Sequence, residues 1–113
     1  MPQNNWIESF PGAITVCDTE GIILEMNDAS AKVFKADGGL SLIGSNLLDC
    51  HPEPARTKLR EMLTEQKSNI YMVEKDGKRK LIYQAPWYQE GEYAGFVEMN
   101  LPLPQDLQLI VRE

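Results

Sequence analysis

The sequence predicts an α+β fold, with strands near both ends of the chain and helices between them. Short runs rich in β-branched and large apolar residues occupy 13–17 and 22–26, and further extended runs follow residue 69. The intervening segment carries apolar residues at helical spacing, most clearly over 55–63. A chain of 113 residues with 42% hydrophobic content is expected to be one domain with its own core.

The charge of the chain narrows the classes of partner. Its 17 acidic against 11 basic side chains give a net charge of −6, which disfavours binding to nucleic acid or anionic lipid. No apolar run approaches the roughly 18 residues of a membrane span, and the first residues lack the basic and apolar regions of a secretion signal. We therefore expect a cytoplasmic protein with no membrane contact, in which Cys17 and Cys50 do not form a disulfide.

Residues 1–12 are predicted to form an amphipathic N-terminal cap. Asn5 and Glu8 have the spacing of a helix capping box, and Trp6 and Phe10 share one face of the turn that follows. This aromatic pair packs either on its own sheet or on another copy of the chain.

The next stretch is predicted to be a β-hairpin. Ala13–Cys17 and Ile22–Met26 are the strands, and Asp18–Gly21 is the turn between them. Asp18 can accept a hydrogen bond from the backbone two residues on, and Gly21 tolerates a positive φ. Two strands alone cannot bury a core, so the rest of the chain must supply a partner layer.

Helices are predicted for the middle of the chain. Asn27 caps a short helix through Phe34, and residues 40–48 are expected to form single helical turns. Pro52 is placed at the entrance of the longest helix, where its missing N–H costs nothing. The buried face of that helix carries Ala55, Leu59, Met62 and Leu63.

The extended pattern returns at Asn69. Asp76-Gly77 between two apolar runs is a strong hairpin signal, and a second turn at 89–91 leads to a strand over 93–99. Pro86 cannot donate to a ladder, so its strand either ends there or turns that position away from a neighbour.

The order of these elements resembles the PAS domain family over about residues 6–99. The resemblance rests on the spacing of Asp18, Gly21, Ile23, Asn27, Ala29, Gly44, Lys75-Asp76-Gly77, Ala85-Pro86, Gly91 and Gly95. It implies a five-stranded antiparallel sheet with helices on one face and a cavity between the two layers. Asp49-Cys50-His51-Pro52 further resembles a PAS subgroup with Cys-His-Pro at the start of the long helix.

The end of the chain departs from the family. Many PAS domains finish with an Asp-Ile-Thr stretch that leads into a helix, whereas this chain has Asn-Leu-Pro-Leu-Pro at 100–104. We therefore do not expect a signal to leave along a continuous C-terminal helix. The chain divides into an N-terminal cap (1–12), a PAS domain (13–100) and a tail (101–113) that leaves the sheet and docks on a neighbour.

The resemblance places a ligand cavity against the inner face of the sheet. It assigns to this cavity the side chains of Phe34, Leu48, Met62, Met72, Ile82, Gln84 and Val97. Gln84 stands out because a buried amide needs partners, which a ligand, a neighbouring side chain or a water supplies. On the opposite face, the candidates for a homodimer interface are Trp6, Phe10, Tyr71, Val73 and Tyr83.

The sequence bears on two cofactors that PAS domains bind, heme and flavin. PAS domains that bind heme commonly ligate the iron through a histidine of the long helix, so His51 is a heme candidate, against a structural or solvent-facing role. Gly44-Ser45-Asn46 resembles the opening of the flavin segment in light-sensing PAS domains, but Leu47 replaces their reactive cysteine. Met72 and Val97 stand where those domains place amides, which leaves the pocket too apolar for flavin.

Catalytic and metal chemistry find little support in the sequence. One histidine and two cysteines do not make a zinc site, and adjacent Cys50 and His51 lack the geometry of a nucleophile and its base. Paired carboxylates and a phosphate-binding loop are missing from the sequence. We therefore expect a protein that is not an enzyme.

The resemblance implies a PAS sensory or regulatory module, which binds a small ligand or a partner protein in signal transduction. The first alternative is a protein-interaction domain that dimerises and whose core is filled by its own side chains. The second is a heme sensor that uses His51. A homodimer and a fused or separate output domain are the expected partners.

Overall fold

The computed structural model describes residues 5–113, with the side chains from residue 6 onward. The capping box predicted at Asn5 depends on a side chain outside the described residues. The elements, in chain order, are α1 (Asn5–Ser9), β1 (Ala13–Cys17), β2 (Ile23–Met26), α2 (Asp28–Val33), the 3₁₀ helices η1 (Lys35–Asp37) and η2 (Gly39–Leu42), α3 (Leu47–Cys50), α4 (Ala55–Glu65), β3 (Asn69–Lys75), β4 (Lys78–Gln89) and β5 (Glu92–Leu103).

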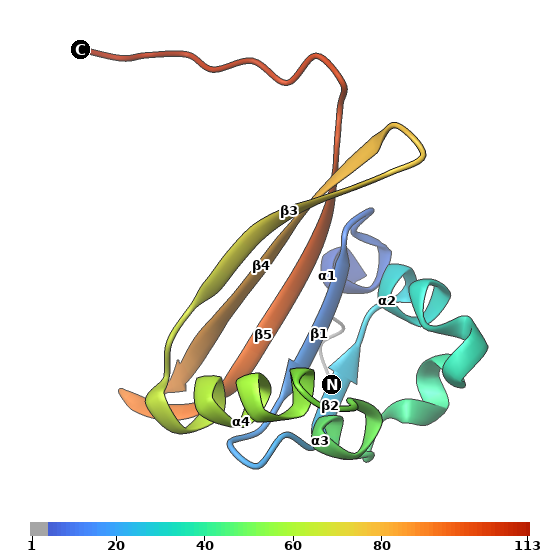
Figure 1. The fold of residues 1–113 in the computed structure, drawn as a ribbon, viewed down its shortest axis with the longest axis vertical. Helices are drawn as coiled ribbons and strands as arrows, with labels where there is room; N and C mark the ends of the chain where they lie inside the picture. The colour runs from blue at the N-terminus through green and yellow to red at the C-terminus, as the bar shows by residue number, and fades with distance from the viewer. Residues whose placement is uncertain (1–4) are drawn as a thin grey trace.

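The strands form one antiparallel sheet of five in the order β2-β1-β5-β4-β3. The last strand, β5, lies in the middle and pairs with both β1 and β4, so the two ends of the chain meet in one layer. Helices α2, α3 and α4 form an arc beside the sheet, with α1 lying apart from α3 and α4 (Figure 1). The predicted five-stranded sheet with helices on one face is confirmed.

The first hairpin closes as its residues predict. The Asp18 carboxylate accepts hydrogen bonds from the backbone N–H groups of Glu20 and Ile22, both at 2.9 Å. Gly21 follows with φ +90°, a conformation that favours glycine. The turn therefore closes through contacts within residues 18–22, and an irregularity between Val16 and Cys17 shifts the strand register beside it.

Asn27 joins this hairpin to the two helices that flank it. Its Oδ1 accepts from the N–H groups of Ile14 and Ser30, at 2.9 and 3.0 Å, and the Ser30 bond is the predicted N-cap of α2. Its Nδ2 donates to the carbonyls of Ile7 and Gly12, both at 2.9 Å. Asn27 is buried, and its one side chain fixes α1, β1 and α2 relative to each other.

Two strands run further than the sequence indicates. β4 continues through Pro86, and β5 continues through Pro102 to Leu103, so the prediction that the tail leaves the sheet at residue 101 is wrong. Pro86 lies beyond the end of β3, and Pro102 lies beyond the end of β1. Each proline therefore has a paired strand on one side only, which is where a sheet tolerates it. The segment outside the sheet is 104–113, which extends away from the body (Figure 1).

The long helix begins later than predicted. α4 starts at Ala55, directly after Pro54, rather than at Pro52. The Glu53 carboxylate accepts from the Thr57 N–H at 3.0 Å and from its hydroxyl at 2.6 Å, and so supplies the cap. At the other end, Met62 and Leu63 are buried as predicted, whereas Ala55 is exposed.

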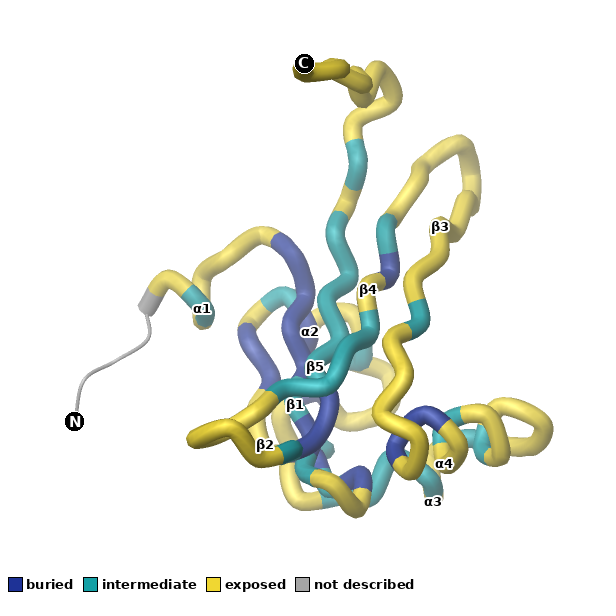
Figure 2. Tube along the Cα trace, turned by 90° about the vertical axis from the view of Figure 1, so that its left-hand side faces the viewer, coloured by how far each residue is buried: buried dark blue, intermediate teal, exposed yellow. Residues whose placement is uncertain are grey.

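The core connects α4 to the middle of the sheet. Its buried cluster consists of Cys17, Met62, Leu63 and Phe96, with Leu47, Leu59 and Tyr93 packed against it. The Tyr93 hydroxyl donates to the Leu63 carbonyl at 2.8 Å, which fastens β5 to the helix. Most of β3 lies outside this core and is exposed (Figure 2).

The register of β3 reverses the predicted faces of that strand. Tyr71 pairs with Ile82 and Ile70 pairs with Tyr83, so Tyr71 and Val73 share the helix side of the sheet. Ile70 and Met72 share the outer side with Tyr83. A change of one residue in register moves every side chain of a strand to the other face.

The backbones of β5 and β1, which are paired neighbours, come unusually close at Gly95. Gly95 has φ +143°, and a Cβ there would overlap the carbonyl oxygen of Cys17. The same oxygen accepts from the Trp87 indole Nε1 at 3.0 Å. Glycine at 95 therefore allows β1 and the Trp87 side chain to meet.

None of the described helices is long and apolar enough to cross a membrane.

Candidate functional site

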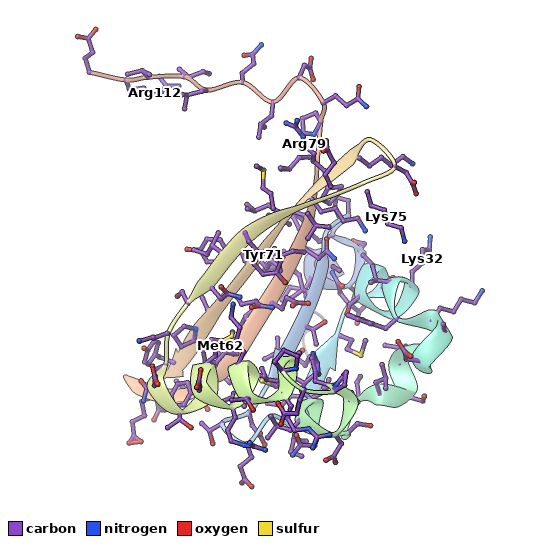
Figure 3. The ribbon with its side chains drawn as sticks, viewed as in Figure 1. Lys32, Met62, Tyr71, Lys75, Arg79 and Arg112 are labelled. Carbon is purple, nitrogen blue, oxygen red and sulfur yellow. The ribbon has the colours of Figure 1, made fainter. Side chains whose placement is uncertain are left out.

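A cavity of about 590 Å³ lies between the sheet and the helices. This volume is within the range of small-molecule sites, roughly 300–1,000 Å³. Figure 3 labels Tyr71 on β3 and Met62 on α4, which line it from opposite layers. The full lining is Thr15, Cys17, Ile23, Met26, Phe34, Asp37, Leu42, Leu47, Cys50, His51, Leu59, Met62, Tyr71, Gln84, Phe96, Val97 and Glu98.

A row of polar side chains crosses the inner face of the sheet. Strand pairing places Asn69, Gln84, Glu98 and Thr15 side by side on β3, β4, β5 and β1. Asn69 Nδ2 donates to Gln84 Oε1 at 3.0 Å, and Gln84 Nε2 donates to Glu98 Oε2 at 2.6 Å. At the β1 end of the row, the hydroxyls of Thr15 and Ser30 share a hydrogen bond of 2.5 Å. The sequence leaves a ligand, a neighbouring side chain or a water as partners of the Gln84 amide, and the structure shows neighbouring side chains in this role.

Tyr71 lies near the same carboxylate. Partial burial raises the pKa of the Tyr71 phenol, and the negative charge of Glu98 raises it further. At neutral pH the phenol is therefore protonated, and its hydroxyl can serve as a donor or an acceptor to a group in the cavity.

His51 contributes an imidazole to the helical wall. Its Nδ1 lies 2.7 Å from the carbonyl oxygen of Leu47. A carbonyl only accepts, so Nδ1 carries the proton, and in the neutral ring Nε2 keeps its lone pair. The carbonyl of His51 in turn accepts from Arg56 Nε at 3.0 Å, which ties the residue to the first turn of α4.

The two cysteines differ in environment although both line the cavity. Cys17 is buried and Cys50 is exposed, and both are free thiols. Burial raises the pKa of the Cys17 thiol, which outweighs the backbone hydrogen bond to Phe96. Cys17 is accordingly a poor nucleophile in this fold.

The predicted ligand residues divide into two groups. Phe34, Met62, Gln84 and Val97 line the cavity, although pairing with Ala85 and Val16 places the Val97 side chain on the outer face. Val97 is therefore part of the lining only through its position between Phe96 and Glu98, whose side chains face inward. The remaining three predicted residues, Leu48, Met72 and Ile82, are not part of the lining.

Each of these corrections has a local cause. Met72 is on the outer face because of the β3 register, and it is 60% exposed. Leu47, the residue before Leu48, supplies the wall contributed by α3. Ile82 lies on the inner face and is buried, outside the part of that face that borders the cavity. The positions of Leu48, Met72 and Ile82 therefore do not support a role in contacting a ligand.

Glu98 and Thr15 are cavity residues that sequence reasoning missed. Alternation along β5 puts Phe96 and Glu98 on one face, opposite Val97. The predicted alternation placed Val97 rather than Glu98 on the inner face, which is why Glu98 was missed.

The predicted interface residues also fall into two groups. Trp6, Phe10 and Tyr83 are exposed, and Tyr83 lies on the outer face as predicted. The prediction that Tyr71 and Val73 lie on the outer face is wrong, because the register of β3 directs both toward the helix side.

Within the described residues, no group of three or more His, Cys, Asp or Glu side chains could hold a metal ion. The second concavity, lined by residues such as Trp87 and Glu92, lies away from the polar row. The cavity between the layers is therefore the candidate site.

Known proteins resemble this arrangement in fold. A C-terminal domain from Streptococcus mutans has 23% identity and a TM-score of 0.69, covering 88% of this chain and 81% of its own. The PAS domain of Bordetella pertussis BvgS has 22% identity and a TM-score of 0.61, covering 88% and 82%. The Vibrio cholerae Aer2 receptor, described as a dual PAS-heme oxygen sensor, has 20% identity and a TM-score of 0.55, covering 82% and 95%.

No curated protein matches the chain in sequence. The family described as "PAS fold" matches residues 7–99, which include four whole strands, most of β5 and the whole cavity lining. The chain belongs to the PAS fold family.

Proposed function

We propose that this protein is a non-enzymatic sensory module of the PAS family that binds a small molecule between its sheet and its helices. The observation that supports the proposal is the cavity of about 590 Å³, which joins an apolar wall to a few convergent polar groups. A protein-interaction domain with a filled core, the first alternative, would not require such a cavity.

The position of the polar row suggests how a bound ligand would act. A ligand that contacts Tyr71 and Glu98 touches β3 and β5, and β5 is the central strand of the sheet. The outer face of the same sheet exposes Ile70, Met72 and Tyr83. Ligand binding changes the output only when it favours one of two packings of these layers.

The outer face is the proposed site of homodimer contact. Tyr83 is 43% exposed there, and Trp6 of α1 is 65% exposed. In this arrangement α1 and the residues up to Gly12 are an N-terminal cap at the dimer, and residues 13–103 are the sensory domain. Residues 104–113 lead toward a fused or separate output domain in the cytoplasm.

The test of ligand binding begins with the purified protein. Native mass spectrometry and ultraviolet-visible absorption should reveal a bound small molecule, which denaturation should release. Met62→Trp places an indole in the cavity and should abolish the extra mass. Leu40→Trp, at a residue that is 54% exposed and outside the cavity lining, should retain it. Equal retention in both variants would refute binding in the cavity.

Sedimentation equilibrium tests the dimer separately. Tyr83→Glu introduces a charge on the outer face and should weaken self-association at least tenfold. Val33→Glu changes a residue of α2 with similar exposure, 45% against 43%, and should leave association unchanged. A monomer in the unsubstituted protein at high micromolar concentration would contradict the proposed homodimer.

A heme sensor is the second candidate, and the geometry of His51 favours it. The Leu47 carbonyl fixes the tautomer in which Nε2 is free, and a second hydrogen bond of this kind commonly orients a metal-ligating histidine. One relative in fold is a dual PAS-heme oxygen sensor. When bound, heme would supply reversible gas ligation at the iron.

Addition of hemin tests this candidate. A Soret band that survives gel filtration, shifts with carbon monoxide and disappears in His51→Ala would support heme. Binding that is unchanged in His51→Ala would show nonspecific association with the apolar wall.

A further inference from the structure

The charges that line the cavity have one sign. Asp37 and Glu98 are the two carboxylates, and no lysine or arginine is present in the lining within the described residues. The other ionisable groups there are the thiols, the imidazole of His51 and the phenol of Tyr71. A ligand that carries a carboxylate or a phosphate would therefore meet repulsion from these carboxylates, with no lysine or arginine in the described lining to offset it.

Glu98 is the polar centre of this lining. One carboxylate oxygen, Oε2, accepts from Gln84 Nε2 at 2.6 Å, and Glu98 makes no ion pair within the described part of the chain. Phe34, Met62 and Phe96 belong to the same cavity and supply apolar surface. A carboxylate partly removed from water is costly without a counter-charge, and a ligand cation can supply one.

The hydrogen bonds along the polar row all run in one direction, toward Glu98. Asn69 donates to Gln84, and Gln84 donates to Glu98, so both amides point their N–H groups toward the carboxylate. Consecutive hydrogen bonds of this kind polarise each other. The Gln84 carbonyl is already used by Asn69, so the row ends in an anionic acceptor at Glu98.

We propose that the ligand of this cavity is an organic amine, an apolar body with one protonated nitrogen that binds the Glu98 carboxylate. The inference rests on the proposed ligand-binding function and names the chemical class of the ligand. The ammonium group donates to Glu98, where a charge-assisted hydrogen bond is stronger than a neutral one. The apolar body lies against the wall formed by Met62 and Phe96.

Three probes of matched shape test this assignment: 2-phenylethylamine, 2-phenylethanol and 3-phenylpropanoate. Their dissociation constants would be measured by titration of amide chemical shifts, which also locates the bound probe. The amine should bind at least tenfold more tightly than the alcohol, as expected for a hydrogen bond to a charged group, and the acid should bind most weakly.

Two charge-matched variants separate the local effect of Glu98 from the net charge of the protein. Glu98→Gln keeps an oxygen that can accept from Gln84, and it should reduce the preference for amine over alcohol to less than threefold. Glu25→Gln, at an exposed residue of β2 whose partner Val16 is on the outer face, should keep the preference.

The outcomes distinguish this assignment from the proposed function. Alcohol and amine binding equally in the cavity would overturn the amine assignment and leave ligand binding in place. Tighter binding of the acid, or an amine preference that survives in Glu98→Gln, would also overturn the amine assignment. If none of the probes shifts cavity amides while the purified protein carries a different small molecule, the amine assignment fails and the sensory function stands.

Discussion

Asn27→Asp tests whether one buried amide holds the N-terminal half together. The substitution keeps the size and the accepting oxygen of Asn27 but removes the Nδ2 group that donates to the carbonyls of Ile7 and Gly12. At neutral pH it also places a negative charge against those two carbonyl oxygens. The N–H groups of Ile14 and Ser30 retain an acceptor.

The expected cost follows from the contacts that are lost. Asn27 is only 3% exposed, so water cannot replace the missing donors. The Gly12 carbonyl is buried and the Ile7 carbonyl is half-buried. Leaving each without a donor costs about 1–3 kcal/mol, which predicts a loss of roughly 2–5 kcal/mol in the free energy of unfolding. A small domain has only about 5–15 kcal/mol in total, so the variant should be close to its limit of stability.

Urea denaturation followed by circular dichroism at pH 7 and pH 4 measures this loss. The loss should be smaller at pH 4, because protonation of the carboxyl group introduced by Asn27→Asp restores one donor for a carbonyl. Asn46→Asp is the matched control: Asn46 caps α3 through Oδ1, and its Nδ2 makes one exposed hydrogen bond of 3.3 Å to Glu20. It should lose less than about 1 kcal/mol, in line with an exposed contact. A loss below about 1 kcal/mol in Asn27→Asp would refute the reasoning.

Three further predictions concern other parts of the fold. Gly95→Ala should destabilise the protein by at least about 3 kcal/mol in urea denaturation, because the added Cβ overlaps the Cys17 carbonyl at a position with positive φ. Gly77→Ala is the control: the space around Gly77 is open, so this variant should lose about 1 kcal/mol. Equal losses in the two variants would contradict the close approach at Gly95. A thiol reagent at pH 8 should modify Cys50 rapidly and Cys17 only on unfolding, because burial raises the pKa of Cys17; two fast equivalents per chain would show that Cys17 is accessible. Burial also raises the pKa values of Tyr71 and Tyr93, so the unfolded chain releases these protons at lower pH than the folded chain does. The temperature of half-unfolding should therefore decrease as the pH is raised above about 9, the range in which ordinary thiols and phenols titrate. An unfolding temperature that increases with pH in this range would contradict the reasoning.

Local chemistry made the first half of the fold predictable. Asp18, Gly21 and Asn27 each act within a few residues of their own position, and the structure confirms the turn and the N-cap that they predict. The start of α4 was predicted at Pro52 and lies at Ala55, because the Thr57 N–H finds its acceptor in Glu53, which is not a standard cap residue.

The face of β3 could have been obtained from the sequence. Ile70 to Val73 are all apolar, so alternation alone does not choose a face. The two-residue turn Asp76-Gly77 fixes the pairing of Lys75 with Lys78, and counting back from it pairs Tyr71 with Ile82. The turn carried the register information that the apolar pattern lacked.

The inner face of β5 could not be obtained in this way. Counting back from the turn at Glu90-Gly91 would place Val97 opposite Gln84, which agrees with the prediction that Val97 faces inward. An irregularity between Trp87 and Tyr88 shifts the register by one residue and brings Glu98 opposite Gln84 instead. Gly95 lies beside this bulge, and an isolated glycine inside a strand is a sequence signal for a bulge, but it does not state which way the register shifts.

The central place of β5 governs how the chain folds during synthesis. Residues 92–103 are translated last among the strands, yet the β1–β2 hairpin and the β3–β4 hairpin meet only through them. Until that segment leaves the ribosome, the two hairpins expose unpaired edges, a state prone to aggregation. We therefore expect a nascent chain stalled before Glu92 to aggregate more readily than one stalled after Leu103.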